Sequence, residues 1–299
     1  MRVLVCGANG FMGGHVAQAL RQAGHELIAG VREPDRGRCD QRQIDFVGWQ
    51  RATSWETCLS GADAVVNTVG VLRDRRHQPM QAIHTEAPRA LFEACARQGV
   101  RRVIHVSALG IEGNPTLYAR TKLAAESALL SLTQAGRVDG TVLRPSIVFG
   151  PGGDSSRLFM GLARLPWLCL PGPVIRARVQ PIAVGELALG IARLLSPEGA
   201  RAPRVLNVVG PRPLTLAAFI ASLRRQAGHV AARTWPMPDL LTHWSARLGD
   251  SFPWAPWCTE TLSLLAQDNV ADPAPFAACL GRRATDPDHL LGGAPCATR

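Results

Sequence analysis

The chain lacks the residue patterns that mark metal sites and disulfide frameworks. Its eight cysteines include no C-x-x-C pair, and its eight histidines are dispersed without an H-x-x-x-H spacing. No secretory signal precedes the first apolar run, so we expect reduced thiols, a cytoplasmic location and no metal site. The cysteines are Cys6, Cys39, Cys58, Cys95, Cys169, Cys258, Cys279 and Cys296.

Long apolar runs and clustered basic residues are also missing. The longest candidate run, residues 158–175, is interrupted by Arg164 and by three prolines. It therefore falls short of the roughly 20 apolar residues that a membrane span needs. The net charge is +10, but the arginines are spread along the chain and accompany no nucleic-acid-binding motif, so we expect no nucleic-acid partner.

Lysine and tyrosine are each nearly absent. Of 33 basic residues 32 are arginine, and the one lysine, Lys122, follows the one tyrosine, Tyr118, by four positions. On a helix this spacing places both side chains on one face. Lysine is retained at position 122 although the chain otherwise uses arginine, which indicates that a compact ammonium is needed there instead of a planar guanidinium.

An ammonium beside a phenol changes the acidity of the phenol. A free phenol has a pKa of about 10. An ammonium about 5 Å away, at an effective dielectric of about 20, would favour the phenolate by about 3 kcal/mol. Tyr118 would then be a usable proton donor or acceptor for a carbonyl or an alcohol. The alternative is an exposed Tyr and Lys pair on an amphipathic helix.

The N-terminus has the pattern strand, glycine turn, helix. Residues 2–6 form a short apolar run, followed by glycines at positions 7, 10 and 13 and by a helical period over residues 15–23. Glycines let the backbone approach a pyrophosphate, and the free N–H groups and dipole of a new helix attract its charge. The spacing is G-x-x-G-x-x-G instead of the G-x-G-x-x-G of ordinary Rossmann dehydrogenases. A glycine-rich turn without a ligand is the alternative.

Together these motifs resemble the short-chain dehydrogenase/reductase superfamily, in the extended and atypical branches that include the NAD-dependent epimerases and dehydratases. The likeness continues through residues 103–110, 143–152, 179–182 and 206–210. Residues 264–270 and the short path from Ser107 to Tyr118 are most similar to bacterial relatives of the NAD(P)H-binding accessory subunit of mitochondrial complex I.

The resemblance implies roles for three residues at a catalytic centre. Tyr118 would be the general acid/base, and Lys122 would lower its pKa and hold the nicotinamide ribose. Ser107, at the end of a strand, would orient the substrate carbonyl. Ser107 and Tyr118 lie eleven positions apart, a much shorter loop than that of the sugar epimerases. A strand-end serine that satisfies a loop amide is the alternative for Ser107.

The resemblance also implies a nicotinamide cofactor. Arg32 follows the second strand, where NAD enzymes tend to carry an acidic residue, and an arginine there can pair with a 2′-phosphate. We therefore expect NADP, with NAD and an incidental surface arginine as the alternative, and Asp45 would meet the adenine. The other residues expected to bind the cofactor are Gly7, Asn9, Gly10, Phe11, Met12, Gly13, Asn67, Val69, Gly70, Tyr118, Lys122 and Pro145.

Strand runs alternate with helical periods through about residue 150, for example in the helical segment 81–98. This alternation predicts an α/β fold with a Rossmann-type doubly wound parallel sheet. We expect an NAD(P)-binding Rossmann core at 1–150 and a flexible tail at 292–299. Between them, a smaller, irregular C-terminal substrate-side lobe at 151–291 would be interleaved with the last sheet strands.

Four of the seven tryptophans fall between Trp235 and Trp257. We expect these aromatic side chains to pack the C-terminal lobe onto the sheet, because tryptophan is mostly buried. The alternative is contact with a membrane surface, a partner or an apolar substrate.

The sequence therefore predicts an NAD(P)(H)-dependent oxidoreductase with Tyr/Lys acid–base chemistry on an unidentified small-molecule carbonyl or alcohol. A non-catalytic NADP(H)-binding structural or assembly subunit of a membrane-associated respiratory complex is the first alternative, with a location peripheral to the inner membrane. A nucleotide-sugar epimerase or dehydratase is the second. The oligomeric state stays open, although helices of this fold often pair subunits.

Overall fold

The computed structural model of the 299-residue chain divides into two compact units. The first comprises Met1–Pro145 and Val184–Asn207, and the second comprises Ser146–Ala183 and Val208–Arg299. The first unit thus includes a helix and a strand from beyond residue 150. The residues outside the described structure are 36, 197–198, 200–201, 251–257, 266 and 293–299. Cys296, all of the expected tail except Gly292, and Trp254 and Trp257 therefore lie outside the described residues.

The first unit is built on a seven-stranded sheet with the order β11-β6-β5-β4-β1-β2-β3. In the run β6-β5-β4-β1-β2-β3 of this order, each strand pairs in parallel with its neighbour. The strands are β1 (Arg2–Cys6), β2 (Glu26–Val31), β3 (Gln41–Gln43), β4 (Ala64–Asn67), β5 (Arg102–Val106), β6 (Asp139–Pro145) and β11 (Val205–Val208). The predicted α/β fold with a doubly wound, Rossmann-type parallel sheet is confirmed.

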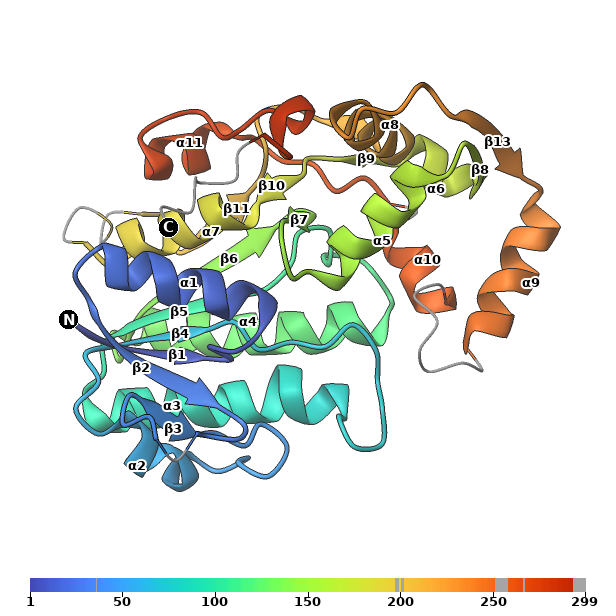
Figure 1. The fold of residues 1–299 in the computed structure, drawn as a ribbon. Helices are drawn as coiled ribbons and strands as arrows, with labels where there is room; N and C mark the ends of the chain where they lie inside the picture. Colours follow the sequence, from blue (N-terminus) through green and yellow to red (C-terminus); the bar gives the residue numbers. More distant parts are fainter. Residues whose placement is uncertain (36, 197–198, 200–201, 251–257, 266, 293–299) are drawn as a thin grey trace. The chain divides into compact units, whose positions relative to one another are not determined.

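Helices cover both faces of this sheet. In Figure 1, α1 lies above the strands and α3 below them, and α1 packs against α7 while α3 packs against α4. The helical elements are α1 (Phe11–Gln22), η1 (Ala52–Trp55), α2 (Glu56–Leu59), η2 (Ala82–Glu86), α3 (Ala87–Gln98), α4 (Leu117–Gln134) and α7 (Val184–Leu194).

The central strands read as continuous apolar runs because both of their faces are covered. Val3, Leu4 and Val5 of β1 are fully buried, and so are Val65 and Val66 of β4. The strand order reverses between β1 and β4. In open α/β sheets such a reversal leaves a crevice at the carboxyl ends of the two strands, where ligands bind.

The helix predicted at 81–98 is present, but its first part is a π-helical turn, η2, that continues into α3. Pro88 has no N–H group, so the α-helical hydrogen bond to the carbonyl of His84 cannot form. The wider turn leaves His84 and Thr85 buried beside α4, where Thr85 donates from Oγ1 to the Thr121 carbonyl over 3.0 Å.

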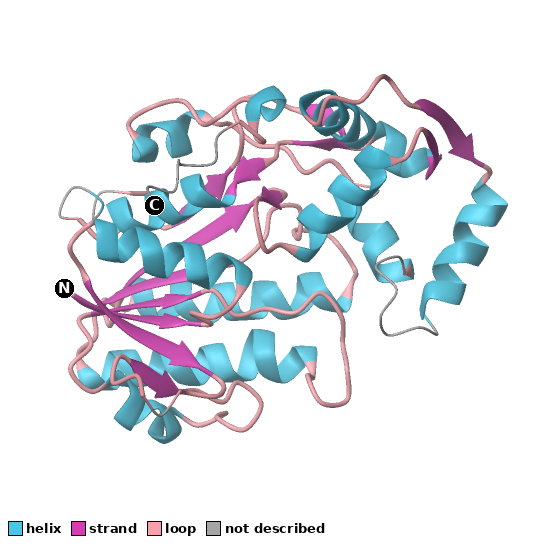
Figure 2. Cartoon of the chain, in the orientation of Figure 1, coloured by secondary structure: helices cyan, strands magenta, loops and turns pink. Residues whose placement is uncertain are grey.

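The second unit is less regular, and Figure 2 shows its strands as short arrows among helices and loops. Its described strands pair in three two-stranded sheets, β10-β7, β12-β9 and β13-β8. The strands are β7 (Val148–Phe149), β8 (Trp167–Pro171), β9 (Arg178–Val179), β10 (Ile182–Ala183), β12 (Leu214–Thr215) and β13 (Arg233–Met237). The helices are α5 (Asp154–Arg164), α6 (Gly172–Arg176), α8 (Leu216–Gln226), α9 (Asp239–Asp250), α10 (Thr259–Leu265), α11 (Ala274–Leu280) and η4 (Pro287–His289).

The core of the second unit is centred on Phe219 of α8. Its ring meets Phe149 and Phe159 edge-on, with centroids 5.7 Å and 5.5 Å apart. The expectation that the clustered tryptophans are buried is wrong for Trp235 and Trp244, which are exposed. Trp235 lies on β13, a strand without a buried residue, and Trp244 lies on α9, which turns Thr242 and Ala246 toward the core instead.

Three further properties concern the described part of the chain. Its seven cysteines are free thiols. Its residues include no group of three or more His, Cys, Asp or Glu side chains placed to hold a metal ion. None of its helices is long and apolar enough to cross a membrane.

Candidate functional site

The glycine loop between β1 and α1 occupies the crevice at the carboxyl end of β1. Gly7 has a left-handed φ of 82°, which an L side chain rarely adopts. Its N–H donates to the Gly30 carbonyl over 2.9 Å, and the Gly10 N–H donates to the Gly7 carbonyl over 2.8 Å. The loop is therefore held in a tight turn directly under the start of α1.

Gly13 is the position where the loop and the helix come closest. A Cβ atom at Gly13 would lie 2.0 Å from the Gly7 carbonyl oxygen and 2.9 Å from Thr68 Oγ1. The first turn of α1 contains no acidic residue, and Gly10 provides no side-chain cap. Free N–H groups at such a helix terminus can bind a pyrophosphate, so this cradle fits a dinucleotide.

Asn9, Phe11 and Met12 complete this predicted binding segment. Asn9 is exposed in the loop, while Phe11 and Met12 are half-buried in the first turn of α1. The Phe11 ring meets His15 edge-on, with ring centroids 6.0 Å apart.

The carboxyl end of β4 is tied to the glycine loop. Thr68 donates from Oγ1 to the Cys6 carbonyl over 2.7 Å. Asn67 accepts at Oδ1 from the Val69 N–H over 3.1 Å, and its amide nitrogen lies 3.2 Å from Nδ1 of buried His105. These bonds fix the path of the chain from Asn67 to Gly70 beside the end of β1.

Tyr118 and Lys122 lie in the first turns of α4, whose N-cap Thr116 accepts at Oγ1 from the Ala119 N–H over 3.2 Å. Lys122 is buried and donates from Nζ to the Val106 carbonyl over 3.2 Å. A Cβ atom at Gly70 would lie 3.1 Å from the same Nζ atom. The single lysine of the chain therefore joins the ends of β4 and β5.

Ser107 follows β5 directly and is buried. Its N–H donates to the Leu143 carbonyl over 2.7 Å. Within the described residues its hydroxyl is buried without a hydrogen-bond partner. Buried hydroxyl groups are normally hydrogen-bonded, so this hydroxyl has capacity to bond a ligand oxygen. Pro145 ends β6 nearby in the sheet, and its carbonyl accepts from the Leu109 N–H over 2.9 Å.

Burial dominates the acidity of the Tyr118 and Lys122 pair. It lowers the pKa of Lys122 to about 8, an effect that the Glu126 carboxylate opposes. It raises the pKa of Tyr118 to about 12. The expected lowering of the phenol pKa is not found, because burial shifts the pKa of Tyr118 in the opposite direction.

His84 is a functional candidate that the sequence did not reveal. It accepts at Nε2 from the Val71 N–H over 2.9 Å, and its Nδ1 lies 3.1 Å from Thr121 Oγ1. Because Nε2 accepts, Nδ1 carries the proton and donates to Thr121. Burial, assisted by the Lys122 charge, lowers the pKa of His84 to about 2, so the ring is neutral. It also meets the Tyr118 ring edge-on at 5.4 Å.

The hydrogen bonds of His84 connect the loop after β4 to the turn of α4 that carries Tyr118 and Lys122. Thr121 in turn lies within donor distance of the Leu117 and Tyr118 carbonyls, at 2.9 Å and 3.0 Å. His84 is therefore a positioning residue. Its sequence signal was weak, since a histidine inside a predicted helix is usually a surface or core residue.

We expect His84→Leu to lower the free energy of unfolding by about 2–4 kcal/mol, because it leaves the Val71 N–H without its acceptor and removes the imidazole donor to Thr121. Denaturant unfolding of the whole chain measures this difference. His77→Leu is the matched control, since His77 is exposed, and a change within about 0.5 kcal/mol is expected there. Equal losses for the two variants would contradict the positioning role.

The adenosine side of the candidate site lies at the ends of β2 and β3, which are neighbours in the sheet. Arg32 follows β2 and is exposed. Asp45 lies two residues beyond β3, and its Oδ1 accepts from the N–H groups of Val47 and Gly48 over 2.9 Å and 3.0 Å. Asp45 therefore holds its own turn, while Arg32 is available to a ligand.

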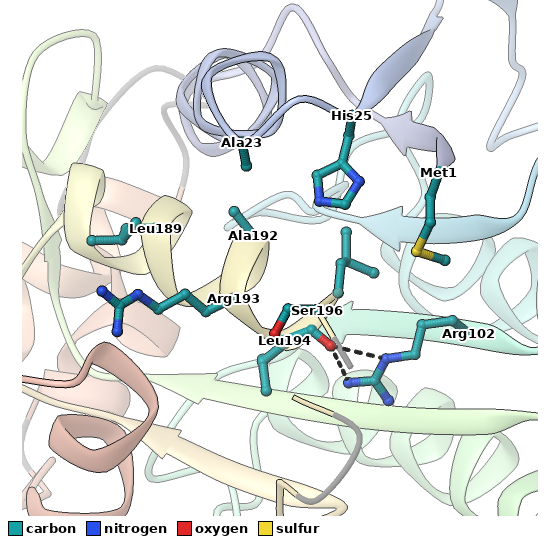
Figure 3. A pocket seen from close by; sticks show the side chains of 10 residues that line it. Met1, Ala23, His25, Arg102, Leu189, Ala192, Arg193, Leu194 and Ser196 are labelled. Atoms are coloured by element: carbon teal, nitrogen blue, oxygen red, sulfur yellow. Dashed lines mark hydrogen bonds between the residues drawn. The ribbon is translucent and has the colours of Figure 1, made fainter. Parts of the chain in front are cut away.

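A groove of about 600 Å³ lies at the opposite, amino end of the strands. Figure 3 shows Met1, His25 and Arg102 facing the end of α7 across it, with the Arg102 guanidinium donating to the Leu194 carbonyl. None of the predicted site residues lines this groove. The candidate site is the carboxyl edge of the sheet, where the first unit gathers every predicted residue.

Comparisons with known proteins agree with this architecture. The sequence model of the NAD dependent epimerase/dehydratase family matches residues 3–165. The chain is 25% identical over 269 residues to NADH dehydrogenase [ubiquinone] 1 alpha subcomplex subunit 9, mitochondrial, of Rattus norvegicus, covering 86% of this chain and 69% of that protein. It is 29% identical to the 3-diazoavenalumate denitrifying reductase of Streptomyces sp, over 79% of this chain and 84% of the reductase.

Among solved structures, that of MoeE5 in complex with UDP-glucuronic acid and NAD has a TM-score of 0.70 and 21% identity, and the match covers 97% of each chain. This likeness shows the fold. The protein of that structure binds NAD, and the matched family is described as NAD dependent.

Proposed function

Because the chain belongs to the NAD-dependent epimerase/dehydratase family, we propose that it is an NADP(H)-dependent oxidoreductase acting on a carbonyl or alcohol. One observation carries this proposal. The only tyrosine and the only lysine of the chain occupy successive turns of α4 at the carboxyl edge of the sheet, and the lysine is buried there. A composition that avoids lysine elsewhere has placed it where a structural role alone would cost desolvation.

A bound nicotinamide would supply or accept the hydride. Toward a carbonyl, Tyr118 donates its phenolic proton to the oxygen as the carbon is reduced, and Ser107 donates a hydrogen bond to the same oxygen. The raised pKa of Tyr118, about 12, keeps the phenol protonated at neutral pH but makes it a weaker acid, so proton donation depends on stabilisation of the phenolate that forms. Lys122, with a pKa of about 8, retains the positive charge that stabilises the phenolate left behind.

The proposed cofactor is NADP(H), held by the glycine cradle at the start of α1. Arg32 supports the choice of NADP over NAD, since a guanidinium after the second strand can pair with a 2′-phosphate. Asn67, Val69 and Gly70 would border the nicotinamide ribose, and Lys122 would bond to its hydroxyls.

Two other functions have observations in their favour. The likeness to a subunit of mitochondrial NADH dehydrogenase favours a non-catalytic cofactor-binding subunit of a respiratory complex. The fold shared with MoeE5, solved with UDP-glucuronic acid, favours a nucleotide-sugar epimerase or dehydratase. The eleven positions from Ser107 to Tyr118 argue against the sugar enzyme, since they shorten the substrate side of the site. Net turnover of NADPH or NADP with a panel of carbonyls and alcohols distinguishes the oxidoreductase from both alternative functions.

We expect the wild-type chain to bind NADPH more tightly than NADH, and Arg32→Ala to weaken NADPH binding by about tenfold or more. NADH binding should stay within about twofold, because NADH has no 2′-phosphate. Titration of nicotinamide fluorescence measures both constants. The control is Arg89→Ala, an exposed arginine on α3, which should change neither. Equal or tighter NADH binding by the wild type would assign the site to NAD.

A further inference from the structure

Helix α9 of the second unit exposes its large apolar side chains. Leu240, Trp244 and Leu248 are 72%, 62% and 60% exposed, and Leu241 is also exposed. At about 100° per residue these four side chains fall within one sector of the helix. We call them the apolar ridge.

The opposite face of α9 carries the small residues and is the buried one. Thr242 and Ala246 are 1% exposed, and Gly249 is also buried. Thr242 is held by its N–H and its Oγ1, which donate to the Pro238 carbonyl over 2.9 Å and 3.2 Å. The helix packs on α10. The orientation of α9 is therefore fixed by contacts, with the amphipathic pattern reversed: the large apolar face is the one that meets solvent.

A pair of exposed aromatic rings lies on the strands that precede this helix. Trp167 of β8 and Trp235 of β13 meet with centroids 5.4 Å apart, and both are exposed. Strand β13 ends at Met237, two residues before α9 begins, and Figure 1 shows β13 leading directly into this outlying helix. The apolar ridge and this tryptophan pair thus belong to one continuous exposed segment.

Three arginines flank these apolar groups. Arg164 ends α5 near Trp167, Arg233 pairs in register with Trp167, and Arg247 lies on α9 beside Trp244 and Leu248. All three are exposed, and within the described residues no ion pair involves them. Asp250, at the far end of α9, instead accepts from the Thr259 N–H over 2.9 Å. Asp239 and Asp250 also lie on α9, so three arginines and two aspartates accompany the exposed apolar groups.

We infer that this segment docks the protein on the surface of a membrane that contains anionic lipids. An interfacial helix places leucine and tryptophan at the boundary between headgroups and acyl chains, and arginines at its margin bind the phosphates. The 12 residues of α9 span about 18 Å, enough to lie in the plane of the interface but too short to cross it. Tryptophan is favoured at this depth because its ring is apolar and its N–H is polar.

The charge and shape of the segment favour lipid over a protein groove. The exposed face of a single helix is convex, so it inserts readily into a deformable layer, whereas a protein would need a matching hollow. The three arginines exceed the two aspartates of α9, and this local excess matches a negatively charged surface, as does the chain's net charge of +10. This inference does not depend on the proposed reaction, since none of these residues belongs to the candidate site.

The test is sedimentation of the full chain with vesicles of phosphatidylcholine, with and without phosphatidylglycerol. We expect binding to the anionic vesicles that weakens as salt rises. The triple variant Leu240→Gln, Trp244→Gln, Leu248→Gln should bind about tenfold or more weakly to them. Leu72→Gln is the matched control, because Leu72 is 61% exposed but lies in the first unit, and it should bind like the wild type.

A charge variant separates a local patch from the general basicity of the chain. Arg164→Gln, Arg233→Gln, Arg247→Gln should weaken binding to anionic vesicles by about tenfold or more. Arg51→Gln, Arg89→Gln, Arg101→Gln, which removes the same charge from exposed positions of the first unit, should leave binding nearly unchanged. Circular dichroism and NADPH binding should be unaltered in all of these variants, which keeps a binding loss distinct from misfolding.

Three results would overturn the inference. The first is wild-type protein that stays in the supernatant with anionic vesicles at low salt. The second is an apolar-ridge variant that sediments as well as the wild type. The third is self-association of the wild type in sedimentation velocity, abolished by the same triple variant, without vesicle binding. This third result would assign the apolar ridge to a second copy of the chain.

Discussion

Replacing Gly13 with alanine should severely weaken cofactor binding. The added Cβ would lie 2.0 Å from the Gly7 carbonyl oxygen and 2.7 Å from the Gly7 carbonyl carbon. Both are backbone atoms, so no side-chain rotation can relieve the contact, and the glycine loop must move away from α1. Overpacking of this kind costs about 1–3 kcal/mol or more, and the displaced loop loses its fit to a pyrophosphate. We expect at least about a hundredfold weaker NADPH binding.

The neighbouring glycine provides the control. A Cβ at Gly14 would lie 3.6 Å from the Ala8 carbonyl oxygen, which is an ordinary contact distance. Gly14 is exposed within α1, where alanine is favoured over glycine by about 1 kcal/mol. Gly14→Ala should therefore bind NADPH like the wild type and unfold at an equal or higher denaturant concentration. Equal NADPH affinity of Gly13→Ala and Gly14→Ala would contradict the proposal that the glycine loop binds the pyrophosphate of the cofactor.

Tyr118→Phe should lower the turnover number by about 10²–10⁴-fold, because it removes only the acid/base group. The phenyl ring keeps the edge contact with His84, whose centroid lies 5.4 Å from that of Tyr118, so the fold of the site should survive. NADPH affinity should stay within a few-fold of the wild type. Steady-state kinetics and a fluorescence titration measure the two quantities separately.

Lys122→Ala should lose both turnover and NADPH affinity, because Lys122 is proposed to hold the ribose and to stabilise the phenolate. Lys122→Arg keeps the positive charge but changes the size and shape of the side chain, so it separates the two contributions. The guanidinium is larger than the ammonium, and a Cβ at Gly70 would already lie 3.1 Å from Lys122 Nζ, so arginine should not restore activity. Unchanged turnover in Tyr118→Phe would rule out the acid/base mechanism. Loss of NADPH affinity in Lys122→Ala, in a protein without turnover, would support a cofactor-binding subunit.

Local patterns allowed much of the first unit to be predicted. The strand at residues 2–6 and the helix after it could be predicted because a short apolar run, a glycine turn and a helical period follow one another within the first residues. Tyr118 and Lys122 were correctly placed on one helical face because their spacing alone decides it. Parallel strands then bring the ends of β1, β4 and β5 to one edge, so the topology gathers residues that the sequence separates.

The features that escaped prediction depend on tertiary contacts. The phenol pKa was expected to fall, but burial raises it, and burial is a property of the folded chain. His84 acquires its role through a π turn and two hydrogen bonds to distant segments. The leucines and Trp244 of α9 form an apolar pattern typical of an inward face, yet Thr242 and Ala246 are the buried residues. Periodicity identifies a face of a helix, whereas its direction is decided by what packs against it.

The central claim is that the chain transfers hydride and does more than hold a cofactor. The most direct measurement incubates the protein with NADPH that carries deuterium at the transferable position of the nicotinamide ring, together with a panel of aldehydes, ketones and quinones. The account predicts that deuterium appears in a reduced product at a rate that Tyr118→Phe abolishes. Tight NADPH binding with all deuterium retained on the cofactor, across the whole panel, would contradict it.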